Sequence, residues 1–162
     1  MVNFTKQQIA DQCRISGPQL VGLPSGIDGA QLLWAMSGNE SSFGANCAPR
    51  HEPAFDVGGV YAPHMQSILA QYGSAAAYSY GPWQIMYVNV WPAATPEQMS
   101  DLKVCSAVTV AFLNRLIARW KPENIAEIGE CWNTGHPMLT PSAPVAAYIQ
   151  RLAANYQVPM PE

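Results

Sequence analysis

The feature that most constrains the fold is one long segment, Thr95–Trp120, whose pattern predicts a single helix with a buried middle. Its first four residues, Thr-Pro-Glu-Gln, provide a cap, a proline at the first helical position and a glutamine that can complete a capping box. Cys105–Leu113 carries no charged residue on any side. A helix without a polar face must be surrounded by other elements, so we expect a central buried helix. The apolar stripe of this segment is Leu102, Cys105, Thr109, Phe112, Leu116 and Trp120.

Shorter helices are predicted before and after this segment, whereas strand signals are scarce. Thr5 with Gln8, and Asp28 with Gln31, have the spacing of helix starts. The region Ala45–Ala62 has no clean period and is expected to be irregular, with room for a short hairpin. Further helices are expected at Pro63–Tyr72, from about Trp83, from Pro122 to about Asn133, and at Ala143–Tyr156. The sequence thus predicts a mainly α single domain over residues 1–162.

The charge pattern excludes some classes of function. Only 8 Lys and Arg stand against 11 Asp and Glu, too few for the basic stripe that nucleic-acid binding needs. No apolar run reaches the length of a membrane span. Charged residues make up 12% of the chain, so the surface is largely neutral and suits a neutral ligand such as a glycan. Met1–Lys6 lacks the layout of a secretory signal, so we expect a signal already removed or another export route.

The four cysteines leave two alternatives open. Cys13, Cys47, Cys105 and Cys131 form an even set with three possible pairings, so two disulfides or four buried thiols would both be consistent with the sequence. No CxxC, HxxxH or HExxH pattern occurs, so neither a metal site nor a cofactor is predicted.

Most of the carboxylates have a structural explanation, and setting these aside leaves a small set of candidates for catalysis. Asp28 is expected to cap a helix, and Glu97 lies in a first turn, where the helix dipole favours negative charge. A solvated stripe is expected for Glu123, Glu127 and Glu130. The carboxylates left without such an explanation are Glu40, Glu52 and Asp56.

Glu40 has the pattern of an inward-facing acid. It follows Met36 by four residues and Leu33 by seven, so it continues the apolar stripe of its helix. Burial and the negative end of the helix dipole both raise the pKa of a carboxyl group there. A carboxylic acid kept neutral near pH 7 can serve as a general acid. The alternative is a glutamate that frays into solvent at the end of its helix.

Aromatic residues gather in the segment Tyr78–Trp91. The five are Tyr78, Tyr80, Trp83, Tyr87 and Trp91. Aromatic faces stack on sugar rings, and the indole and phenol also offer a polar group. The alternative is a small core cluster without a ligand.

Three segments together resemble one enzyme family. Asn39–Gly44 (Asn-Glu-Ser-Ser-Phe-Gly) resembles the Glu-Ser motif of the lytic transglycosylase and goose-type lysozyme superfamily. Tyr80–Met86 (Tyr-Gly-Pro-Trp-Gln-Ile-Met) resembles its Gly-Leu-Met-Gln-Ile segment, and Ala126–Gly135 resembles its Ala-Tyr-Asn-x-Gly segment. The three occur in the family's order, over roughly Leu32 to Tyr156.

This resemblance implies a lysozyme-like helical fold with a peptidoglycan-binding groove. Glu40 would protonate the glycosidic oxygen between N-acetylmuramic acid and N-acetylglucosamine and then act as a base. In a transglycosylase it would activate the muramoyl 6-hydroxyl, giving a 1,6-anhydro product. Ser41 would orient Glu40, and Gln84 would bond substrate near the cleavage point. Trp132 would replace the family tyrosine, and Asn133 would be the sugar-binding asparagine.

Departures from the family pattern bear on the reaction type. Trp83 makes the expected groove wall more aromatic, with Tyr80 beside it, and Trp132 lacks the phenolic hydroxyl that could tune the acid. A longer segment than usual separates Glu40 from Gln84, and it contains Arg50-His51-Glu52-Pro53 and Asp56.

Glu52 and Asp56 decide between hydrolysis and transglycosylation. An inverting hydrolase needs a second carboxylate ~6.5–9.5 Å from the acid. If neither residue reaches the site, the transglycosylase mechanism with Glu40 alone is favoured. The alternative to reaching the site is that each is a loop carboxylate, paired with Arg50 or capping Val57–Gly59. Glu52 could also bind a sugar hydroxyl or a stem peptide.

Other classes remain as alternatives. Cys47 with one of the histidines could form a cysteine peptidase or amidase acting on the cell wall. The domain could also bind glycans without turnover, or cut chitin in place of peptidoglycan. We expect the protein to be a monomer that binds peptidoglycan strands outside the cytoplasm. The three histidines are His51, His64 and His136.

Overall fold

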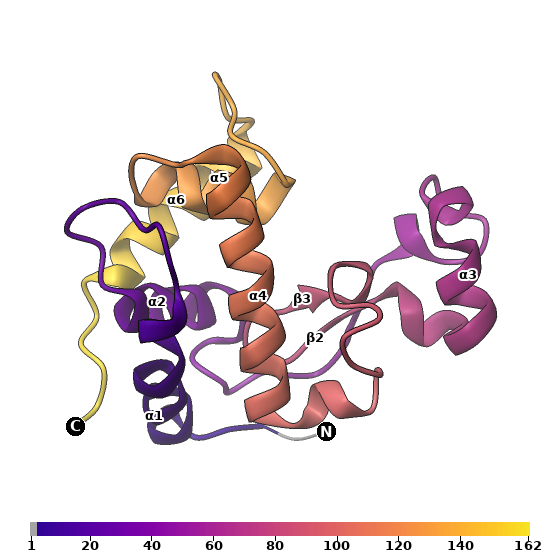
Figure 1. The fold of residues 1–162 in the computed structure, drawn as a ribbon, viewed down its shortest axis with the longest axis horizontal. Helices are drawn as coiled ribbons and strands as arrows, with labels where there is room; N and C mark the ends of the chain where they lie inside the picture. Colours follow the sequence, from indigo (N-terminus) through magenta and orange to yellow (C-terminus); the bar gives the residue numbers. More distant parts are fainter. Residues whose placement is uncertain (1–2) are drawn as a thin grey trace.

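Six α-helices and a small antiparallel sheet make up residues 3–162, the part of the chain that the computed structural model describes (Figure 1). The helices are α1 (Lys6–Ser16), α2 (Gly29–Ser41), α3 (Ala62–Tyr72), α4 (Leu102–Trp120), α5 (Ile125–Thr134) and α6 (Ala143–Tyr156). The strands are β1 (Arg50–His51), β2 (Tyr78–Tyr80) and β3 (Ile85–Met86). The prediction of a mainly helical domain is confirmed.

The first two helices begin where the capping pairs predict. The Thr5 hydroxyl accepts a hydrogen bond from the Gln8 backbone, and the Gln8 side chain accepts one from the Thr5 backbone. The Asp28 carboxylate accepts from the backbone N–H of Gln31 at the start of α2. These bonds satisfy backbone donors that have no partner within the helix, which is why both starts can be predicted locally.

The central helix α4 starts later than the sequence predicts. Thr95 and Gln98 do exchange the expected capping bonds, but these close only a single 3₁₀ turn. The chain is then extended at Asp101, whose carboxylate accepts from the backbone N–H groups of Lys103 and Val104. A charged acceptor that satisfies two free donors is the stronger cap, so α4 begins at Leu102. Its middle is buried, as predicted.

The three strands occupy regions that the sequence predicts as loop, short hairpin or helix. Arg50 of β1 pairs with Ser79 of β2, and Ser79 pairs in turn with Met86 of β3. The predicted helix from Trp83 is therefore wrong. Trp83 lies in the turn between β2 and β3, where Gly81 and Gln84 both have positive φ, of 71° and 43°. A left-handed backbone at these two positions cannot continue into an α-helix.

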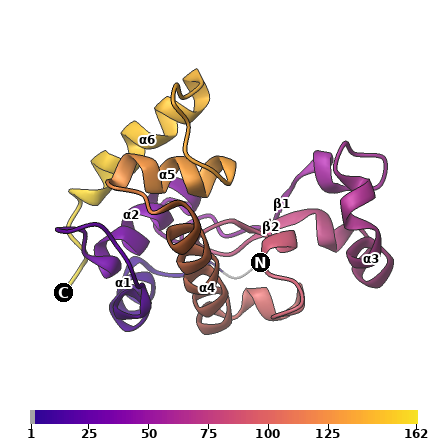
Figure 2. The same ribbon diagram turned by 45° about the horizontal axis from the view of Figure 1, so that its top comes forward.

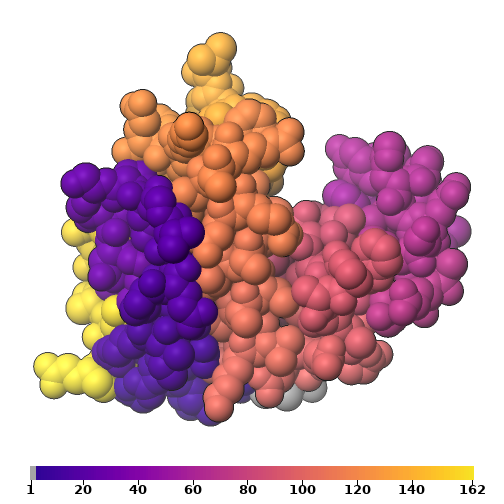
Figure 3. All heavy atoms as spheres, viewed as in Figure 1, coloured from indigo at the N-terminus to yellow at the C-terminus, as the bar shows by residue number. Residues whose placement is uncertain are grey.

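The molecule divides visibly into a helical body and a smaller lobe. Helices α1, α2, α4, α5 and α6 pack together, and the sheet joins them to the lobe that holds α3 (Figure 1). In the view turned by 45° the lobe again lies apart from α5 and α6 (Figure 2). The space-filling view shows a deep notch between the lobe and the body (Figure 3). The largest fully buried side chains include Trp34, Trp83, Tyr87, Met36 and Leu113.

Candidate active site

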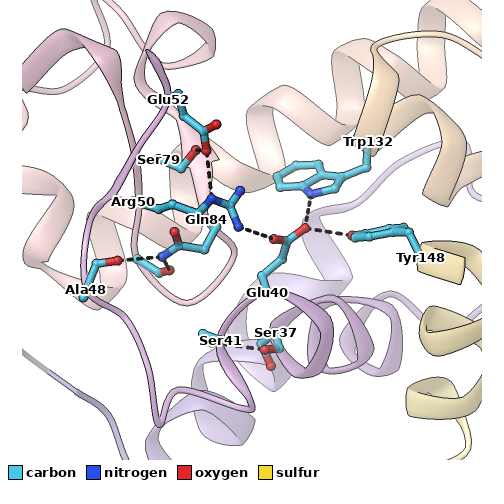
Figure 4. Close-up of polar contacts among 11 residues, drawn as sticks. Ser37, Glu40, Ser41, Ala48, Arg50, Glu52, Ser79, Gln84, Trp132 and Tyr148 are labelled. Carbon is cyan, nitrogen blue, oxygen red and sulfur yellow. Dashed lines mark hydrogen bonds and ion pairs between the residues drawn. The ribbon is translucent and has the colours of Figure 1, made fainter. Parts of the chain in front are cut away.

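Glu40 lies in the last turn of α2 and borders a cavity of about 460 Å³. The residues that line this cavity come from α2, α4, α5, α6, β1 and the segment from the β2–β3 turn to Asn89, so the helical body and the sheet both contribute to it (Figure 4). The Glu40 side chain is only 9% exposed. Its predicted inward orientation is confirmed, and the alternative of a frayed glutamate is excluded.

Two donors hold the same oxygen of the Glu40 carboxyl group. The indole Nε1 of Trp132, on α5, donates to Oε1 at 3.0 Å. The hydroxyl of Tyr148, on α6, donates to Oε1 at 2.9 Å. The other oxygen, Oε2, lies 4.0 Å from Nη1 of Arg50 (Figure 4). Because both neutral donors use Oε1, Oε2 is the oxygen left to carry a proton.

Burial raises the pKa of Glu40 above the ordinary value of 4.5. The hydrogen bonds from Tyr148 and Trp132 and the charge of Arg50 oppose this shift, while the charge of Glu52 adds to it. Desolvation is the largest effect, so the carboxyl group stays protonated at a higher pH than an exposed glutamate. A raised pKa and a free oxygen facing the cavity are the properties of a general acid.

Arg50 stands between two carboxylates. Its Nε donates to Oε1 of Glu52 at 2.8 Å, and the Ser79 hydroxyl donates to the same oxygen at 2.8 Å. The nitrogens of a guanidinium form a compact planar fork, so these contacts place the nearest oxygens of Glu40 and Glu52 no more than about 9 Å apart. Glu52 lines the same cavity as Glu40. Glu52 therefore has the predicted pairing with Arg50 and also lines the cavity, whereas its action on a water or a sugar stays a prediction.

Asp56 does not line this cavity. Its carboxylate accepts from the Val57 backbone N–H and lies 2.7 Å from the His51 ring. The Val57 bond, followed by the His51 bond, lowers the pKa of Asp56. This residue therefore has the structural role that the sequence left as its alternative.

Gln84 and Asn133 both line the cavity beside Glu40, as expected. The Gln84 side-chain nitrogen donates to the carbonyl oxygens of Gly81, at 2.9 Å, and Ala48, at 3.3 Å. These bonds fix the amide, and the positive φ of Gln84 is a strain of the kind found at functional sites. Contact of either residue with a sugar stays a prediction.

Three expected roles are not found. Ser41 makes no hydrogen bond to Glu40 among residues 3–162, since its hydroxyl donates to the Ser37 carbonyl and accepts from the Gly44 N–H. It therefore fixes the end of α2 rather than the acid itself. Trp83 is fully buried and donates to the Leu33 carbonyl, and the Tyr80 hydroxyl donates to Ala75. Neither of these two rings lines the cavity, because the tight turn directs them into the core.

Tyr148 is the contact that sequence reasoning missed. It is 5% exposed and lies on the buried face of α6 with Val145 and Leu152. That spacing could have marked Tyr148 as inward-facing. Its contact with Glu40, 108 residues earlier, has no local signal.

Several structural expectations outside the cavity are also settled. All four cysteines are buried free thiols, so the disulfide alternative is not realised. The solvated stripe is wrong for Glu130, which is 6% exposed and accepts from the Met138 N–H, because the chain after α5 folds back over it. Helix α5 begins at Ile125, capped by Asn124, and not at Pro122.

The alternative chemistries find little support in the structure. Burial raises the pKa of the Cys47 thiol, and Cys47 Sγ donates to the Gly44 carbonyl. Between residues 3 and 162 no histidine hydrogen-bonds to Cys47, so no activated thiol is formed there. The same residues contain no group of three or more metal-binding side chains.

No helix within residues 3–162 has both the length and the apolar character needed to cross a bilayer. Comparisons with protein-family models, curated proteins and solved structures find no match to this chain.

Proposed function

We propose that this protein cleaves the glycan strands of peptidoglycan, with Glu40 as its general acid. The observation that carries the proposal is the bonding of Glu40, which lines the cavity: both neutral donors engage Oε1, so Oε2 is left without a neutral donor, 4.0 Å from Arg50. The three sequence segments that resemble the transglycosylase and goose-type lysozyme superfamily supply the substrate class. A lysozyme-like relationship and a location outside the cytoplasm are part of the same proposal, since peptidoglycan lies outside the cytoplasm.

In the first step, the proton on Oε2 of Glu40 passes to the glycosidic oxygen as the bond from that oxygen to the muramoyl C1 breaks. The electron pair of this bond leaves with the departing sugar. The Glu40 carboxylate that forms is stabilised by the donors from Trp132 and Tyr148 and by the nearby Arg50. The muramoyl ring carries the developing positive charge.

In the second step of a lytic transglycosylase, the muramoyl 6-hydroxyl attacks C1 of the same sugar. Glu40 removes the hydroxyl proton and returns to its acid form, so one residue serves both steps. The product is a 1,6-anhydromuramoyl end, and water is not consumed. This is the reaction we favour, because it requires only the carboxyl group whose environment suits proton transfer.

Hydrolysis is the second candidate, and the position of Glu52 is the observation that favours it. Its carboxylate lines the same cavity, and the shared contacts with Arg50 keep its nearest oxygen within about 9 Å of Glu40, an upper limit that falls inside the ~6.5–9.5 Å range of inverting glycosidases. Glu52 would then accept the proton of an attacking water. However, Oε1 of Glu52 already accepts from Arg50 and Ser79, which leaves only Oε2 for that water.

Mass spectrometry of digested peptidoglycan separates these reactions. Anhydro ends would identify a transglycosylase, whereas reducing ends would identify a hydrolase. Binding without any product would indicate a glycan-binding domain and would overturn the enzymatic proposal. A Cys47→Ser variant serves as a control, since loss of activity in that variant alone would point to a cysteine hydrolase.

A further inference from the structure

Within residues 3–162, the cavity beside Glu40 is lined by four charged residues, and one of them is a cation without a carboxylate partner. The four are Glu40, Glu52, Arg50 and Arg151. Arg50 is paired with Glu52 at 2.8 Å, and burial favours the neutral form of Glu40. Arg151 makes no ion pair with any of residues 3–162. Arg151 therefore gives the cavity a positive charge that no carboxylate of residues 3–162 pairs with, although the chain as a whole has a net charge of −3.

Arg151 is placed to meet a ligand beside the reacting bond. It follows Tyr148 by three residues on α6, so the two share a face of the helix, about 4.5 Å apart along its axis. Tyr148 donates to Glu40, while Arg151 is exposed and lines the same cavity. Arg151 thus lies one turn of α6 from the tyrosine that holds the acid.

We propose that Arg151 binds a carboxylate carried by the 3-O-lactyl substituent of a muramoyl residue. This inference rests on the proposed function and narrows its substrate class. In peptidoglycan, every second sugar carries this substituent, which ends in a free lactyl carboxylate or continues into a stem peptide with carboxylates of its own. Chitin has neither. Arg151 is therefore the residue that selects peptidoglycan over chitin.

The chemistry of arginine suits this role. A guanidinium presents donors in a planar fork that matches both oxygens of a carboxylate, and it remains charged at all physiological pH values. Removing one partner of such a charged hydrogen bond lowers affinity by about ten-fold to a hundred-fold.

The test is a binding measurement in the full chain carrying Glu40→Gln, so that no ligand is consumed. Calorimetry compares this protein with a version that also carries Arg151→Gln. The ligands are peptidoglycan fragments with stem peptides, peptide-free glycan strands with lactyl carboxylates, and chitin oligomers of the same length. Arg119→Gln is the matched control, since Arg119 lies over the Trp120 ring and does not line the cavity.

We expect Arg151→Gln to weaken binding of one or both muramoyl ligands by at least ten-fold, with chitin oligomers unaffected and partial recovery in Arg151→Lys. Loss with the stem-peptide ligand alone assigns a peptide carboxylate, and loss with the peptide-free ligand alone assigns the free lactyl carboxylate. Loss with both ligands shows that Arg151 binds either carboxylate. Unchanged affinity for both muramoyl ligands, or an equal loss for chitin, would overturn the proposal. Because binding is measured without cleavage, an absence of glycosidase activity in the unmodified chain would contradict the proposed function separately.

Discussion

The indole nitrogen of Trp132 lies 3.0 Å from Oε1 of Glu40, although the two residues are 92 positions apart in the chain. The family resemblance places Trp132 where the family has a tyrosine, and Trp132 lacks the phenolic hydroxyl that could tune the acid. In this protein the indole N–H donates to the carboxyl group instead, and Tyr148 provides a phenolic hydroxyl on the same oxygen. The sequence predicts neither hydrogen bond.

Glu40→Gln should abolish cleavage of purified cell walls. The amide keeps the size of the side chain but cannot deliver a proton, and general acid–base catalysis contributes about 10²–10⁴-fold to such reactions. Release of soluble muramoyl fragments measures the effect. Glu123→Gln is the control, since that residue is exposed and outside the cavity. Substantial activity in Glu40→Gln would refute the assignment of the acid.

Removing either donor to Glu40 should move the pH profile. Trp132→Phe and Tyr148→Phe each delete a hydrogen bond that lowers the pKa of Glu40, so its pKa rises further. A general acid must be protonated, so activity should persist to higher pH in both variants. The maximal rate should fall, because the carboxylate formed in the transition state loses a donor. A profile that moves toward acid pH would contradict this account.

Arg50 and Glu52 should shift the pKa of Glu40 in opposite directions. The positive charge of Arg50 lowers that pKa and the negative charge of Glu52 raises it. Arg50→Gln should therefore raise the Glu40 pKa and Glu52→Gln should lower it. Carbon-13 NMR titration of the Glu40 carboxyl group measures both without any need for turnover. Shifts of the same sign in both variants would show that Arg50 moves when its partner is removed.

Glu52→Gln also separates the two proposed reactions. If Glu52 only anchors Arg50, cleavage should continue with a modest loss of rate, and the product should keep its anhydro ends. If Glu52 holds the attacking water, hydrolysis should fall by at least about 10²-fold. Analysis of the products by mass spectrometry gives the answer, with Asp56→Asn as the control carboxylate outside the cavity.

The raised pKa of Glu40 should make stability depend on pH. A carboxyl group whose pKa is higher in the folded state than in the unfolded state stabilises the fold at pH values below its unfolded-state pKa, here 4.5. That contribution is lost as the pH rises through its folded-state pKa. Between these two pKa values, the free energy of unfolding of the unmodified chain should therefore fall relative to that of Glu40→Gln. Denaturant titrations at several pH values check the difference. A constant difference would show that Glu40 titrates normally in the fold.

Gly29→Ala should destabilise the fold. An added Cβ at Gly29 would lie 2.3 Å from the carbonyl oxygen of Gly17, so the backbones on either side of this contact would have to separate. Overpacking of this kind costs about 1–3 kcal/mol. Thermal or denaturant unfolding measures the loss. A melting temperature equal to that of the unmodified chain would show that α2 shifts without cost.

The sequence by itself determined the features that depend on near neighbours. The capping pairs at Thr5 and Asp28 start their helices as predicted, and the four- and seven-residue spacing from Met36 and Leu33 turns Glu40 inward. Each of these depends on residues within two helical turns, because backbone donors and side-chain periodicity are local properties.

Only the tertiary structure decided which groups surround Glu40. Tyr148, Trp132 and Arg50 come from two helices and a strand that lie far apart in the sequence, and Glu52 reaches the cavity because β1 pairs with β2. The turn at Trp83 likewise buried a ring that the sequence assigned to the groove. The pKa of a carboxyl group depends on all the charges and dipoles within a few ångströms, and that set is assembled only when distant segments pack together.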